Sequence, residues 1–132
     1  MTSLSEAQMD AAHEFANAAV ATISDAGRMH PGTVIAATAR MGGTYLFRSF
    51  GLHLASFPDT QRKLEPVYGP IKDRFSLSSQ EAAQAAAVAT ALLIRHCAQV
   101  MDPTVGFGIA VYGFVEGSKT APDPIELLPS TT

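Results

Sequence analysis

The sequence contains little of three things that would narrow its function: cysteine, large aromatic side chains and charge of one sign. Cys97 is the one cysteine in 132 residues, and tryptophan does not occur. A lone cysteine excludes an internal disulfide framework and a zinc site built from several thiolates. This usage is typical of a reducing compartment, so we expect a cytoplasmic protein.

Neither sign of charge dominates, because nine basic and twelve acidic residues give a formal net charge of −3. Nucleic acids and anionic membrane surfaces attract basic proteins, so neither partner is expected. The stretch of residues 62–74 has a local charge of +2, and Pro66 and Pro70 should break any long helix in it. Its basic and aromatic residues are Arg62, Lys63, Lys72, Arg74, Tyr68 and Phe75. We interpret this stretch as a surface loop opposite an acidic N-terminal helix.

Long apolar runs are also missing. The three best candidates for a membrane span are residues 33–47, 82–94 and 104–115. The first contains Arg40, and the other two are shorter than the roughly 18 residues that a span needs. We therefore predict that these segments are buried core helices and that the protein has no membrane span. The first residues also lack the basic and apolar regions of a signal peptide.

Alanine is abundant, with 22 residues, and much of it falls in segments with helical periodicity. We predict long helices over residues 4–26, 32–50 and 79–101. Ser3 and Glu6 have the spacing of a capping box, which predicts the start of the first helix. Ser78 and Glu81 have the same spacing before the third helix.

Residues 104–116 are compatible with two structures. A helix beginning at Asp102-Pro103 would carry a seam of small residues, Gly106, Ala110, Gly113 and Gly117. A strand would alternate large and small residues instead. We prefer a short C-terminal helix, because Asp-Pro is a helix-start signal and no second strand is available for pairing.

Together these segments predict an all-α fold. We expect an alanine-rich helical bundle of three long helices plus a shorter C-terminal helix, with the first two helices packed as an antiparallel hairpin. Residues 1–117 should form a single helical domain, and residues 118–132 an extended or disordered tail. Each alanine buries little area, at about 25 cal/mol per Å², so we expect a homo-oligomer, most simply a dimer. The alternative is a monomer whose core is completed by its seven phenylalanines.

Charges on the first two helices need partners. Asp10 and Glu14 share one face of the first helix with Glu6, and Arg40 and Arg48 share a face of the second. In an antiparallel hairpin Asp10 would lie against Arg48, which predicts a structural salt bridge. The alternative is that Arg40 or Arg48 binds an anionic ligand.

Candidate metal ligands and nucleophiles are few. A dinuclear carboxylate site needs Glu-x-x-His motifs, and none occurs in the sequence. We predict no metal site and interpret His13 and His96 as half-buried polar residues, with a looser metal or haem site at these two histidines as the alternative. Cys97 should be a buried, inert thiol, because it follows an Ala/Leu-rich segment. No phosphate-binding glycine loop, nucleophile elbow or zinc-protease motif is present, and no particular cofactor is indicated.

We therefore predict a non-catalytic, self-associating protein that acts through protein–protein contacts, with a further protein partner left open. The alternative is a helical bundle that binds a small molecule or a metal in an interhelical pocket. The candidate ligand-binding residues are Arg40, Arg48, Tyr45, His13 and His96. An apolar version of that pocket would lie near Gly42-Gly43 and be lined by Met41, Tyr45, Phe47, Leu52 and Leu54. An enzyme that uses Cys97 or a histidine base has the least support.

Overall fold

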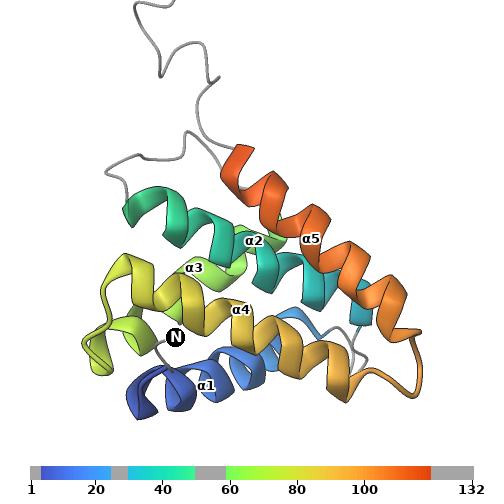
Figure 1. The fold of residues 1–132 in the computed structure, drawn as a ribbon, viewed down its shortest axis with the longest axis horizontal. Helices are drawn as coiled ribbons and strands as arrows, with labels where there is room; N and C mark the ends of the chain where they lie inside the picture. The colour runs from blue at the N-terminus through green and yellow to red at the C-terminus, as the bar shows by residue number, and fades with distance from the viewer. Residues whose placement is uncertain (1–3, 25–29, 50–58, 120–132) are drawn as a thin grey trace, which may run out of the picture.

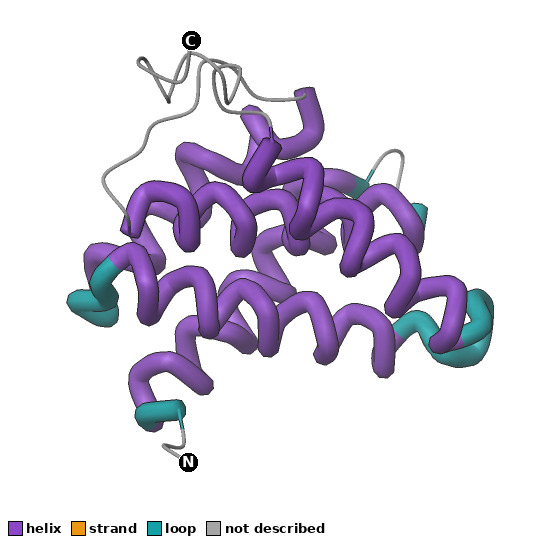
Figure 2. Tube along the Cα trace, turned by 45° about the horizontal axis from the view of Figure 1, so that its top comes forward, coloured by secondary structure: helices purple, strands orange, loops and turns teal. Residues whose placement is uncertain are grey.

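Helices account for most of the chain that the structure describes, namely residues 4–24, 30–49 and 59–119 of a computed structural model. They are α1 (Glu6–Ile23), α2 (Pro31–Ser49), α3 (Asp59–Arg74), α4 (Ser79–His96) and α5 (Pro103–Lys119). Figure 1 shows α4 between α1 and α2, with α5 against α2 and α3 behind them. The same residues contain no strand (Figure 2), so the all-α prediction is confirmed, and residues 104–116 are helical.

Helix α1 has α4, not α2, as its main neighbour. It packs chiefly on α4 and α3 and touches α2 only lightly. The amide of Gln8 donates hydrogen bonds to the Glu81 carbonyl, at 3.2 Å, and to the Gln84 amide oxygen, at 2.6 Å. Figure 1 shows α1 and α4 side by side, running in the same direction. The first two helices run in opposite directions and are in contact, but the main neighbours of α1 are α4 and α3, and Arg48 is paired with Glu65 instead of Asp10 (Figure 1).

Capping boxes begin two of the helices. Ser78 and Glu81 make the predicted box at α4. At α1 the box is formed by Ser5 and Gln8, two residues later than the predicted pair. Gln8 thus caps its own helix and contacts α4 as well. Ser3 lies outside the described residues.

Helix α3 corrects the prediction of a loop. It runs through Pro66 and Pro70, and both prolines are exposed. Each proline removes one backbone hydrogen bond to the carbonyl four residues earlier. Because the two prolines are four residues apart and face outward, the freed carbonyls lie on the exposed side, where water hydrates them. Leu64, Tyr68 and Ile71 on the other side are buried and hold the helix against the core.

The core combines small helix faces with a few large side chains. Several alanines of α1 and α4 are fully buried, among them Ala11 and Ala85, and the largest buried side chains are Tyr45, Tyr68 and Phe15. The rings of Phe15 and Tyr68 stack with centroids 4.3 Å apart. The Tyr68 hydroxyl donates to the Phe15 carbonyl at 3.0 Å and lies 3.2 Å from the Thr38 hydroxyl. Two tyrosines therefore supply the largest side chains of this core. Of the phenylalanines expected to complete the core of a monomer, Phe15 is buried and Phe107 is exposed.

Two predicted boundaries move. The helix predicted over residues 79–101 ends at His96, and turns follow it. Helix α5 extends to Lys119, so the first two residues of the predicted tail are helical. Residues 120–132 of that tail lie outside the described residues.

Candidate functional site

The five predicted ligand-binding residues do not form one site. Tyr45 and Arg48 lie at the contact between α2 and α3, whereas His13 and His96 line a cavity between α1 and α4. Arg40 is half-buried on α2 and lies on the side of α5. The hydrogen bond to Glu116 and the charge of that carboxylate raise the pKa of the Tyr112 phenol on α5, and the Arg40 charge opposes this shift. A separate apolar pocket between α4 and α5 involves none of these five residues.

At the first location Arg48 is paired with Glu65, and the salt bridge predicted with Asp10 is wrong. The Arg48 Nη2 atom lies 2.6 Å from Glu65 Oε1, and the guanidinium carbon lies 5.8 Å from the centre of the Tyr45 ring. Burial raises the pKa of the Tyr45 phenol, and the nearby Glu65 charge raises it further. Because a carboxylate already balances the guanidinium, this geometry gives no support to an anion-binding arginine.

Three buried polar atoms beside this ion pair have no hydrogen-bond partner among the described residues. They are the Tyr45 hydroxyl, Gln61 Oε1 and Glu65 Oε2. The other end of the Gln61 amide donates to the Thr44 hydroxyl. Buried polar atoms that lack a protein partner are ordinarily paired with ordered water. We therefore interpret the cluster as a site for ordered water and not as a site for a charged substrate.

The acidic face of α1 finds a basic partner on α3. Glu14 accepts a hydrogen bond from Arg74 in an exposed ion pair. The basic stretch therefore does lie opposite α1, as predicted, although it is helical. Tyr68 from the same stretch is fully buried, so it has no face free for stacking on a base.

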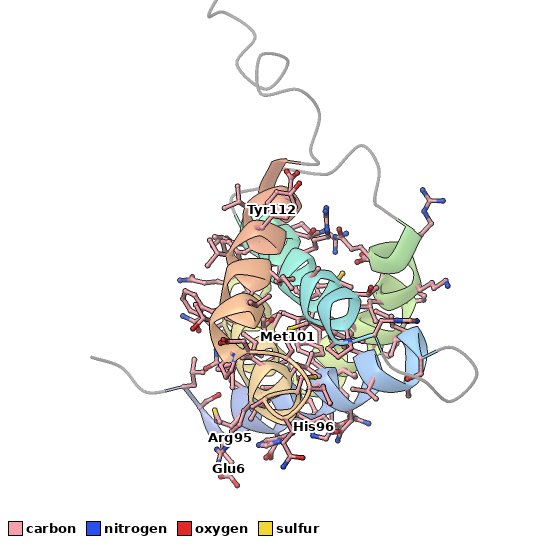
Figure 3. All side chains as sticks on the ribbon, turned by 90° about the vertical axis from the view of Figure 1, so that its right-hand side faces the viewer. Glu6, Arg95, His96, Met101 and Tyr112 are labelled. Carbon is pink, nitrogen blue, oxygen red and sulfur yellow. The ribbon has the colours of Figure 1, made fainter. Side chains whose placement is uncertain are left out.

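At the second location His13 and His96 line one cavity of about 290 Å³. His13 comes from the middle of α1 and His96 from the last residue of α4, and both are exposed. Figure 3 shows His96 at the end of α4 beside α1. The remaining lining residues are Ala16, Asn17, Val20, Leu92 and Leu93. The two histidines singled out by the sequence analysis are thus brought to the same cavity.

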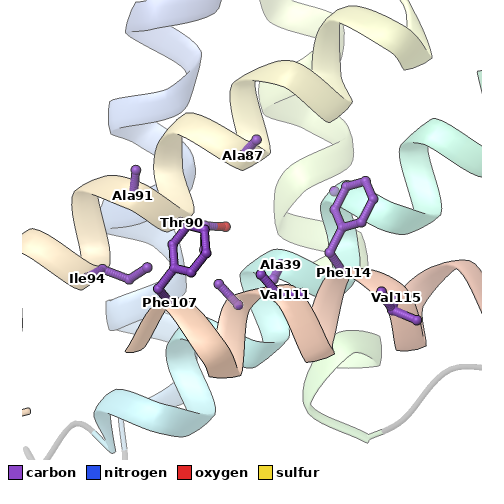
Figure 4. Close-up of a pocket in the computed structure, with 11 residues that line it drawn as sticks. Ala39, Ala87, Thr90, Ala91, Ile94, Phe107, Val111, Phe114 and Val115 are labelled. Carbon is purple, nitrogen blue, oxygen red and sulfur yellow. The ribbon is translucent and has the colours of Figure 1, made fainter. Parts of the chain in front are cut away.

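An apolar pocket of about 240 Å³ opens between α4 and α5, with α2 as its floor. It includes Gly42, so a pocket near that glycine exists. Of the predicted lining residues, Met41 and Tyr45 do not line it, and the side chain of Phe47 lies outside the described part of the structure. Met41 and Tyr45 are buried in the core instead, and Leu52 and Leu54 lie outside the described residues. Figure 4 shows the rings of Phe107 and Phe114 on either side of the space, facing small residues of α4 such as Ala87 and Ala91.

Helix α5 presents an apolar face beside this pocket, which corrects the prediction that it is buried. Phe107 is 65% exposed, Tyr112 62% and Val105 53%, and Figure 3 shows Tyr112 on the outside of the bundle. Val111 and Val115 are also exposed. We call these five residues, with Gly108 among them, the α5 face. Sequence periodicity missed it because α5 is apolar nearly all round, which leaves no polar side to mark the surface.

The glycines of α5 differ in their surroundings. A Cβ atom on Gly113 would lie 2.8 Å from the Ala36 carbonyl oxygen, and one on Gly106 would lie 3.3 Å from Ile94. Close helix packing therefore explains both. A Cβ atom on Gly108 would meet nothing within 4 Å in the part of the chain that the structure describes. Gly108 is the glycine of the α5 face. No contact with the described residues requires a glycine at this position.

Cys97 is buried at the end of α4, and burial raises the pKa of its thiol. A protonated, inaccessible thiol is a poor nucleophile, which agrees with the inert residue expected from the sequence. Among the described residues, no group of three or more histidine, cysteine, aspartate or glutamate side chains is placed to hold a metal ion.

The chain matches no protein-family model, and no curated protein or solved structure shows significant similarity to it. Within the described residues, every helix is too short or too polar to span a membrane.

Proposed function

We propose that the protein acts by binding a second copy of itself through the α5 face, without a catalytic step. The observation that carries this proposal is the exposure of five large apolar residues on one helix, two of them aromatic. Single exposed apolar residues are common, but a contiguous group marks an interaction surface.

The spacing of the α5 face suits a partner helix. Val105, Gly108, Tyr112 and Val115 recur at intervals of three, four and three residues, which aligns them along one side of the helix. A mid-helix glycine costs about 1 kcal/mol relative to alanine. At Gly108 nothing among the described residues offsets that cost, whereas a second helix crossing there would approach closely because no side chain intervenes.

A second copy suits this surface better than a different partner for reasons of charge and shape. Residues 103–115 carry no charged side chain, and charge occurs at the end of the face, where Glu116 is hydrogen-bonded to Tyr112 and the positive charge of Arg40 lies nearby. Each copy offers bulky Phe107 and Tyr112 beside small Gly108, Ala87 and Ala91, so each supplies both projections and hollows. A two-fold contact requires this self-complementarity.

The available area is also sufficient. Exposed aromatic residues of about 150–250 Å² each and somewhat smaller valines give the α5 face roughly 500 Å² per chain. Two copies would then bury about 1,000 Å², the size at which specific interfaces begin. We therefore expect a dimer of moderate affinity, with a dissociation constant on the order of 1 μM.

Light scattering coupled to size exclusion, together with sedimentation equilibrium, tests the proposal. The wild-type protein should show a dimer that dissociates on dilution through the micromolar range. Val111→Glu should be monomeric at every concentration, because two buried like charges would face each other across the contact. Circular dichroism should show unchanged helicity, since Val111 is already half exposed.

Ala21→Glu is the matched control, because Ala21 is an exposed helical residue of α1 and lies away from α5. It should dimerise as the wild type does. The proposal is wrong if the wild-type protein is monomeric at high micromolar concentration, which would leave the α5 face to a different protein. It is also wrong if Val111→Glu and Ala21→Glu have the same effect.

A further inference from the structure

The cavity between α1 and α4 gathers three side chains that can donate electron pairs to a metal. His13 and Asn17 are four residues apart on α1, so they lie on the same side of that helix. His96 reaches the same cavity from the end of α4. Ala16, Val20, Leu92 and Leu93 line the rest with apolar surface. Nothing in the α5 face takes part.

We propose that this cavity binds a divalent first-row transition metal ion, with the imidazoles of His13 and His96 as ligands and the Asn17 side-chain oxygen as a third. Neutral imidazole is a preferred ligand of Zn²⁺, Ni²⁺ and Cu²⁺. Two ligands four residues apart on one helix is also the spacing by which helices bind zinc in metalloproteases. A third ligand from a facing helix completes one side of a tetrahedral or octahedral site.

The donor set leaves coordination positions open. Three protein ligands are the number found in zinc sites that keep a water or a substrate in the fourth position. The cavity of about 290 Å³ is far larger than the roughly 10–15 Å³ that a single bound water needs. A bound metal would therefore keep exchangeable water, and its affinity should be lower than that of a closed structural site.

The sequence contains four histidines, His13, His30, His53 and His96, which allows a matched control. The variant His30→Ala/His53→Ala retains only the two histidines of the cavity. Calorimetric titration with Zn²⁺ should give one site per chain with micromolar affinity in both this variant and the wild type. Titration with Co²⁺ should give visible d–d absorption that reports ligand number and geometry.

Removal of a ligand should weaken binding, and addition of a better one should strengthen it. His13→Ala and His96→Ala should each weaken Zn²⁺ binding at least tenfold, and both side chains are exposed, so the variants should fold. Asn17→His should tighten binding about tenfold or more, because a third imidazole replaces a weak amide ligand.

Two results would overturn the proposal. One is the absence of a stoichiometric Zn²⁺ site in the wild-type protein. The other is loss of binding in His30→Ala/His53→Ala with no effect of His13→Ala, which would assign the metal to the other histidines. An unchanged affinity in Asn17→His would remove Asn17 from the ligand set. Because Val111→Glu leaves the cavity intact, a failure of self-association and a failure of metal binding can be told apart.

Discussion

Gly113 of α5 lies against the backbone of Ala36 in α2, so that a Cβ atom added to Gly113 would stand 2.8 Å from the Ala36 carbonyl oxygen. Both partners in this contact are helix backbone, so neither can yield without moving a whole helix. The contact sets how closely α5 approaches α2. With Gly113 turned inward, Gly108 and the exposed residues around it are turned outward.

Gly113→Ala should destabilise the protein, and Gly108→Ala should not. At Gly113 the overpacking penalty of about 1–3 kcal/mol exceeds the gain in helix propensity. At Gly108 the gain of up to about 1 kcal/mol is unopposed within the chain. Urea unfolding at a concentration where the chain is monomeric measures both. Equal effects of the two substitutions would mean that α5 does not pack on α2 through Gly113.

Tyr68→Phe should cost about 1–2 kcal/mol of unfolding free energy, because it leaves the Phe15 carbonyl and the Thr38 hydroxyl without their shared partner. Tyr45→Phe is the matched control, since it removes a buried hydroxyl with no hydrogen-bond partner among the described residues. That change should cost less than Tyr68→Phe, because it removes a contact with solvent and leaves no described protein group unpaired. Thermal or urea unfolding distinguishes them, and a larger loss in Tyr45→Phe would contradict this assignment.

Arg48 and Glu65 should show coupling in a double-mutant cycle. The two side chains are about one quarter exposed, so solvent screening limits the coupling to about 0.5–1 kcal/mol. The same cycle on Asp10 and Arg48 should give a value near zero, because Arg48 is paired with Glu65 of α3. Coupling between Asp10 and Arg48 as large as the coupling between Arg48 and Glu65 would show that Asp10 and Arg48 are neighbours, as the sequence predicted.

Cys97 should react slowly with iodoacetamide in the folded protein. The thiolate is the reactive form, and burial raises the pKa of this thiol above its ordinary value of 9.0. Native alkylation near pH 8 should therefore be much slower than alkylation in urea. The native rate should still be rising where the rate of the unfolded chain levels off. Equal rates in the two states would show that the thiol is accessible.

The raised thiol pKa also has a consequence for stability. The native state holds the thiol proton more tightly than the unfolded state does, so stability is unaffected below the titration range of the unfolded thiol. It falls as the pH rises through that range, because the unfolded chain then ionises first. Comparison of wild-type and Cys97→Ala unfolding at neutral and alkaline pH isolates this contribution. A loss that is the same in both proteins would assign it to other groups.

Local sequence signals predicted most of the helices. The Ser78–Glu81 box and the Asp102-Pro103 start act within one turn of backbone, and α4 and α5 begin at them. The same kind of reasoning placed the α1 box two residues early and treated Pro66 and Pro70 as helix breakers. Proline position alone does not decide the outcome, because its cost depends on whether the freed carbonyl reaches water, and that depends on which face is buried.

The sequence by itself determined that this chain is helical, rich in small residues and without an assembled catalytic motif, since these properties follow from residue type and spacing along the chain. Only the tertiary structure decided that Arg48 pairs with Glu65, that His13 and His96 share a cavity, and that α5 leaves an apolar face outward. Each of these depends on which helices are neighbours. Which helices are neighbours depends on the packing of side chains that are far apart in the sequence. Small residues such as Gly113 and Ala36 let two helices approach closely, and the local sequence does not show which helices these will be.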